Sequence, residues 1–113
     1  MIDVDQAIEL ELRVRDLIEE IERDLERAEA TVRPPGKLDG TEGRLSRQDS
    51  MLHHEMAKAG LRRQRQRLAA LREALVRMDK GAYGVCANCG DWISWERLDG
   101  QPEAHLCGTC AAR

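Results

Sequence analysis

The sequence has no phenylalanine, one tyrosine and two tryptophans, so aromatic residues make up only 3% of its 113 residues. A chain so poor in large aromatic side chains cannot fill the thick core of a globular domain. Charged residues reach 35%, above the usual share of roughly a quarter. Long helices with a narrow apolar stripe flanked by charge suit this composition. So small a chain also needs an added source of stability, and its four cysteines are the candidates.

No apolar run approaches the roughly 20 residues that a membrane span needs, and the N-terminal sequence MIDVDQAIELEL lacks the regions of a secretory signal. We therefore expect a cytoplasmic protein with no membrane association. Cytoplasmic thiols stay reduced, which favours metal binding over disulfides. No phosphate loop, dinucleotide fingerprint or nucleophile–base spacing is present. His53 and His54 are adjacent and so point to different helix faces; we expect no enzymatic activity.

Glycine and proline are absent from about residue 4 to residue 30, where apolar residues recur at steps of three and four. This spacing predicts a helix over about 4–30. Prolines and glycines interrupt residues 31–45, which we interpret as a tip that turns the chain before a second helix over about 46–79, ended by Gly81. The sequence thus predicts a mainly α protein, with an antiparallel two-helix coiled-coil hairpin over residues 1–80. The first apolar stripe comprises Leu10, Val14, Leu17, Ile21, Leu25, Ala28 and Val32, and the second comprises Leu52, Met56, Leu61, Leu68, Leu71, Leu75 and Met78, with polar Gln64 on it.

The net charge of −3 hides an asymmetry along the chain. Residues 1–30 carry a net charge of −7, whereas residues 58–80 carry +6, so the two helices are expected to attract each other. Exposed ion pairs contribute about 0.2–1 kcal/mol each, and they set register more than stability. The arginines of the second helix spread around it instead of forming one basic face, which argues against nucleic-acid binding. They are Arg62, Arg63, Arg65, Arg67, Arg72 and Arg77.

Two Cys-x-x-Cys pairs lie near the C-terminal end, with seventeen residues between them. This spacing is typical of zinc sites. A two-residue gap lets a tight turn aim both sulfurs at one tetrahedral ion, and the loop brings the second pair round to the other corners. We predict one structural Zn²⁺ held by Cys86, Cys89, Cys107 and Cys110, in a finger over residues 81–113 at the base of the hairpin. Two disulfides, a redox-active thiol pair and an iron–sulfur cluster are the alternatives.

A short two-stranded ribbon is predicted between the cysteine pairs, with Asp99 and Gly100 as its turn. Its inward-facing residues are Ile93, Trp95 and Leu106. We interpret Trp92 and Trp95 as packing between the finger and the hairpin, the alternative being an aromatic surface for a partner. His105 is not expected to bind the metal, because four cysteines already complete a tetrahedral site.

The sequence Tyr83-Gly-Val-Cys-Ala-Asn-Cys-Gly, followed by Arg97-Leu98, Pro102 and Leu106-Cys-Gly-Thr-Cys110, resembles the DksA/TraR family of zinc-finger transcription regulators. The resemblance implies a bacterial protein whose four cysteines bind zinc and whose partner is RNA polymerase. Family members insert the coiled-coil tip into the secondary channel of the polymerase and modulate initiation. The resemblance also makes ppGpp a candidate partner, since some members cooperate with it, and it implies no sequence-specific nucleic-acid binding.

Well-studied members of this family carry two aspartates at the tip, in a pattern like Asp-x-x-Asp-Arg. Asp39 and Glu42 have that spacing here, and Arg44 follows one residue out of place, so these three are the expected contacts with the partner. A solvated turn is the alternative for each. The run GRLSRQD from Gly43 to Asp49 looks like that of a distinct subgroup of short members. A competing hypothesis is a helical-hairpin module that binds another helical protein or a second copy of itself, with purely structural zinc.

Overall fold

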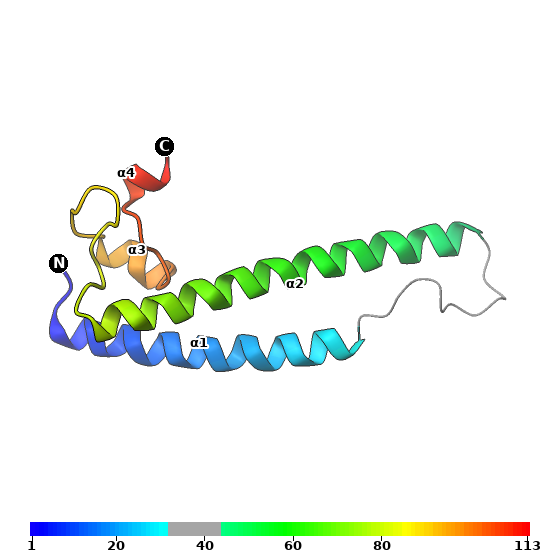
Figure 1. Ribbon diagram of the computed structural model, residues 1–113, viewed down its shortest axis with the longest axis horizontal. Coiled ribbons are helices and arrows are strands. Elements are labelled where there is room, and N and C mark those ends of the chain that lie inside the picture. Colours follow the sequence, from blue (N-terminus) through cyan, green and yellow to red (C-terminus); the bar gives the residue numbers. More distant parts are fainter. Residues whose placement is uncertain (32–43) are drawn as a thin grey trace.

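The computed structural model describes the backbone of residues 1–31 and 44–113 and the side chains of residues 1–30 and 51–113. Its elements, in chain order, are α1 (Val4–Thr31), α2 (Arg44–Asp79), α3 (Trp95–Gly100) and α4 (Gly108–Ala111). Figure 1 shows α1 and α2 side by side and antiparallel, with both termini and the two short helices at one end. The predicted fold class, a mainly α hairpin with four cysteines at its base, is confirmed.

The ends of the two long helices at the base follow from local hydrogen bonds. Asp3 and Gln6 form a reciprocal cap at the start of α1, in which the Gln6 N–H donates to Asp3 Oδ1 at 2.8 Å and the Asp3 N–H donates to Gln6 Oε1 at 3.0 Å. Gly81 ends α2 with a φ of 71°, and the Ala82 N–H donates to the Arg77 carbonyl at 2.8 Å. A left-handed glycine with this bond is the usual stop signal of a helix.

The hairpin is held together by one row of aliphatic side chains, here called the seam. Its buried members are Val14, Ile18, Ile21 and Leu25 from α1 and Leu68 and Leu71 from α2. Fully burying such a side chain contributes about 1.5–3 kcal/mol, so the seam is the main source of hairpin stability. Ile18 is not part of the predicted stripe. It is buried because the packed face of the helix is wider than that single row of residues.

Two predicted members of the second stripe do not join the seam. Leu52 and Met56 are 58% and 61% exposed, so the prediction for them is wrong. Gln64 is also exposed. The physical reason is length, because α2 has 36 residues and α1 has 28, so the early turns of α2 lack a facing turn of α1.

Ion pairs connect the acidic first helix to the basic second one, as the charge asymmetry predicts. Arg65 pairs with Glu29, and Arg72 Nη2 lies 3.5 Å from Glu22 Oε2. Within the described residues, no helix is both long enough and apolar enough to cross a membrane.

Candidate metal centre

The first cysteine pair lies in a tight turn between residues 84 and 91. Gly84 and Gly90 flank the pair with φ values of 87° and 80°, a region that favours glycine. The Cys86 N–H donates to the Asp91 carbonyl at 2.8 Å, and the Gly90 N–H donates back to the Cys86 carbonyl at 3.0 Å. These bonds close the turn and bring the two sulfurs of the pair together.

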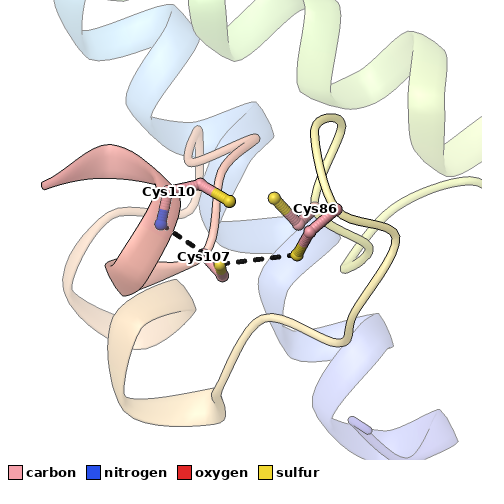
Figure 2. A group of neighbouring side chains, drawn as sticks. Cys86, Cys107 and Cys110 are labelled. Carbon is pink, nitrogen blue, oxygen red and sulfur yellow. Dashed lines mark hydrogen bonds between the residues drawn. The ribbon is translucent and has the colours of Figure 1, made fainter. Parts of the chain in front are cut away.

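The second pair is built on the short helix α4. Cys107 is its N-cap, and the Cys107 sulfur accepts the Cys110 N–H at 3.4 Å (Figure 2). The two turns are joined where the Ala87 N–H donates to the His105 carbonyl at 2.8 Å. His105 therefore contributes its backbone to the site. Among the described residues, the side chains grouped closely enough to hold a metal ion are the four cysteines alone.

The four sulfurs lie within 4.8 Å of one another, and those of Cys89 and Cys107 are 3.7 Å apart. Tetrahedral Zn–S bonds of about 2.3 Å would separate the sulfurs by about 3.8 Å, so the cluster has the size of a four-thiolate metal site. Figure 2 shows the side chains of Cys86, Cys107 and Cys110 converging from two segments of the chain. All four cysteines are free thiols, which disagrees with the disulfide alternative.

Hydrogen bonds and mutual proximity set the sulfur charges. Backbone N–H groups of Cys89, Cys107 and Asn88 lower the pKa of Cys86 to about 6. The Asp91 N–H lowers the pKa of Cys89, but the sulfur of Cys86 and burial outweigh it and raise that pKa to about 12. Sulfurs this close resist ionising together, and a dication among them would remove the repulsion. The donor set therefore fits a soft divalent metal such as zinc.

The segment between the cysteine pairs contains helix α3 in place of the predicted ribbon. Ser94 caps this helix, and its hydroxyl accepts a backbone N–H from the first turn at 3.3 Å. Asp99 and Gly100 end the helix, so the prediction of a hairpin turn there is wrong. Within the described residues, strand-like pairing is limited to one antiparallel bridge between Val85 and Trp92.

A second apolar cluster fixes the finger to the hairpin. Leu10 of α1, Leu98 of α3 and Ile93 have exposed fractions of 0%, 0% and 1% and lie in one cluster that also includes Cys86. The metal site and the base of α1 therefore share one core. Trp95 packs against this cluster as predicted. Trp92 is 55% exposed and lies outside the cluster, and it lines a pocket together with Ile2 and Ile8 at the base of the hairpin.

Charged side chains of both long helices reach the finger. The Arg13 guanidinium donates to Asp99 Oδ1 at 2.7 Å and to the Asp99 carbonyl at 2.8 Å. Arg67 Nε donates to Glu103 Oε2 at 2.9 Å, and Arg77 donates to the Glu103 carbonyl at 3.5 Å. These contacts orient the finger against the hairpin.

The expected tip contacts are not placed by the structure. Asp39 and Glu42 lie outside the described residues. Arg44 begins α2, but its side chain also lies outside the described part. Their role therefore stays a prediction.

A solved structure shares this architecture. The chain matches the structure of transcription factor DksA2 from Pseudomonas aeruginosa with a TM-score of 0.78 and 26% sequence identity, covering 98% of this chain and 84% of that one. The chain is DksA-like. The resemblance to the DksA/TraR zinc-finger regulators that the sequence indicates is therefore confirmed by the fold and by the clustered cysteines.

Two further comparisons add less to the DksA-like assignment. No family model matches the chain. An uncharacterized protein of Aquifex aeolicus (strain VF5) is 43% identical over 47 residues, which are 39% of this chain and 32% of that protein. The match thus spans about a third of the length of this relative.

Proposed function

We propose that this DksA-like chain is a transcription regulator that binds RNA polymerase and modulates initiation by inserting the hairpin into the secondary channel. The observation that carries the proposal is the match to a protein named a transcription factor over 98% of this chain. The shape agrees, because the molecule measures 61 × 30 × 19 Å and its two long helices form a thin rod. A rod of these proportions reaches into a channel while the finger stays at its base.

The metal of the four-cysteine cluster is Zn²⁺ in this proposal, and its role is structural. Four thiolates complete a tetrahedral coordination sphere and leave no open position for substrate or water. Bound zinc would tie together the two turns that flank α3, and so would hold the surface that docks on α1. Elemental analysis of protein purified under reducing conditions should give one zinc per chain. A different metal, or zinc well below one per chain, would contradict this assignment.

A binding assay with core RNA polymerase tests the partner. We expect full-length protein to bind at micromolar concentration or tighter, and the double variant Asp39→Asn/Glu42→Gln to bind more weakly. The matched control is Glu19→Gln/Glu20→Gln, which removes two negative charges from an exposed part of α1. A photo-crosslinking residue at position 41 should join the chain to the polymerase near its secondary channel. If the parent protein fails to bind, the proposed function is wrong.

Two finer parts of the proposal have their own tests. Addition of ppGpp to the same assay shows whether the nucleotide strengthens the effect on initiation, as it does in some family members. Substitution of Arg44 by glutamine tests the third expected tip contact. We also expect no sequence-specific nucleic-acid binding, and a salt-dependent shift of labelled DNA would contradict that expectation.

The exposed side chains of Leu52 and Met56 favour a second candidate function, a helical-hairpin module that binds another helix or a second copy of the chain. Large apolar side chains in neighbouring turns are common at protein interfaces. Light scattering distinguishes the two candidates, because self-association through this part of α2 gives a dimer mass. If the chain does form this dimer, the variant Leu52→Gln/Met56→Gln should have the mass of a monomer. If the chain is a monomer that binds the channel, the parent and the variant should have the same mass.

A further inference from the structure

Three of the four cysteine sulfurs accept hydrogen bonds from backbone N–H groups. Cys86 receives backbone N–H groups, the foremost from Cys89. Cys89 in turn receives the N–H of Asp91, and Cys107 receives the N–H of Cys110 at 3.4 Å. Hydrogen bonds of this kind offset the negative charge of thiolate ligands and orient them toward a metal. Because these donors belong to the backbone, side-chain substitution does not remove them.

For the fourth sulfur, that of Cys110, the described residues provide no backbone donor like the one that its counterpart Cys89 has. In the first turn, Gly90 adopts a φ of 80°, which lets the N–H two residues after Cys89 reach its sulfur. The residue two after Cys110 is Ala112, and its N–H donates instead to the Gly108 carbonyl at 3.2 Å. The chain continues in helical conformation there, so the equivalent N–H is already used.

A side chain supplies the missing donor. Asn88 Nδ2 lies 3.4 Å from Cys110 Sγ, a normal distance for an N–H···S hydrogen bond. Asn88 belongs to the first turn and Cys110 to the second, so this bond crosses the site from one cysteine pair to the other. In the part of the chain that the structure describes, Asn88 is the one donor other than a cysteine found for this sulfur.

We propose that Asn88 is a positioning residue for the metal, which strengthens zinc binding by donating its side-chain amide to the Cys110 thiolate. The inference rests on the zinc assignment of the proposed function. Asn88 does not bind the metal itself but supports one of its four ligands. It also explains how the Cys110 sulfur receives a hydrogen bond although no glycine follows Cys110. Outer residues of this type typically contribute about 10- to 100-fold to metal affinity.

The two cysteine pairs offer a matched set of variants. Asn88→Ala removes the donor, and Asn88→Asp keeps the shape but replaces the donor with a negative charge beside the thiolates. Thr109→Ala is the control, because Thr109 occupies the equivalent place in the second pair and is exposed. Zinc affinity is measured for each full-length protein by competition with a chromogenic chelator, and the helical signal in circular dichroism confirms that the hairpin is intact.

We expect zinc affinity about 10- to 100-fold lower for Asn88→Ala, a larger loss for Asn88→Asp and no change for Thr109→Ala. A spectroscopic measurement separates donation to sulfur from a general effect on folding. In protein saturated with Co²⁺, loss of the hydrogen bond should move the thiolate-to-metal charge-transfer band to lower energy in Asn88→Ala, and the band should stay in place in Thr109→Ala.

Two outcomes would overturn the inference, and they are distinguishable. If the parent binds one zinc and Asn88→Ala binds it equally well with an unchanged Co²⁺ band, Asn88 has no role in the metal site, and the zinc assignment stands. If the parent itself binds no zinc, the zinc assignment fails and this inference fails with it.

Discussion

Truncation of Leu98 to alanine should detach the finger from the hairpin. The Leu98 side chain is fully buried and lies in the same cluster as Leu10 of α1. The substitution removes three carbon atoms, and at about 0.8 kcal/mol for each buried methylene the transfer term is near 2.4 kcal/mol. The residual cavity adds to this term, which brings the expected loss to about 2–5 kcal/mol. That is a large share of the 5–15 kcal/mol by which domains are typically stable.

Urea unfolding provides the assay for Leu98→Ala, with circular dichroism reporting the helices. Tryptophan emission reports the finger, because Trp92 and Trp95 both lie there and Trp95 packs on the affected cluster. The matched control is Leu12→Ala, the same chemical change at a side chain that is 60% exposed, for which we expect at most about 0.5 kcal/mol. Hydrogen exchange should quicken in α3 before it quickens in the seam. Equal losses for the two variants would refute the argument that this cluster fixes the finger.

Four other outcomes are expected. Burial raises the pKa of Tyr83 from 10.0 to about 12, because the buried site disfavours the phenolate. The contribution of the neutral Tyr83 side chain to the free energy of unfolding is therefore complete below pH 10 and is lost as the pH rises to about 12. Tyr83→Phe should remove this pH dependence and, by deleting a 2.7 Å hydrogen bond, cost about 1 kcal/mol; identical pH profiles for the two proteins would contradict this. Gly84→Ala should destabilise the folded protein by about 1 kcal/mol or more, because the φ of 87° at Gly84 is strained for alanine. Steric overlap is not the cause, since the nearest side-chain atom lies 3.9 Å from an added Cβ. Gly100→Ala, at an open position, is its control in thermal melts, and equal effects would argue against backbone strain. Asp99→Asn should weaken the pair with Arg13 and cost about 0.2–1 kcal/mol at low salt, with the difference vanishing in 1 M salt; a difference that persists there would rule out an ionic origin. If the cysteine cluster binds zinc as proposed, chelation of that zinc should unfold the finger while the seam, which contains no cysteine, keeps most of the helical signal; complete loss of helix on chelation would contradict the independence of the seam.

The cysteine cluster was predictable because its information is local. Each pair forms a tight turn whose two-residue gap already brings two sulfurs together, so what remained was for the loop to bring the pairs together. The long helices were predictable for a related reason. Their periodic apolar residues, and the absence of glycine and proline from the first helix, favour one backbone conformation over many turns.

Helix α3 was missed although a local signal for it exists. Asp99 followed by Gly100 is a common hairpin turn and favours a ribbon, whereas Ser94, whose hydroxyl caps the helix, is a residue type typical of a helix start. The competition was decided by Leu98, since a helix places this side chain in the cluster with Leu10. Short segments have only a weak intrinsic preference for one secondary structure, and the free energy of a tertiary contact of this kind is larger than that preference.

Local sequence information is enough to specify the two long helices, the acidic and basic character of each, and the grouping of four thiols. Which apolar side chains are buried depends on the packing of the helices, because a side chain is covered when another element lies opposite it. Leu52 and Leu68 belong to the same helix, yet the first is exposed and the second lies in the seam. The tertiary structure also decides the contacts of the finger, since Arg13 and Asp99 are 86 residues apart and no local pattern predicts that they meet.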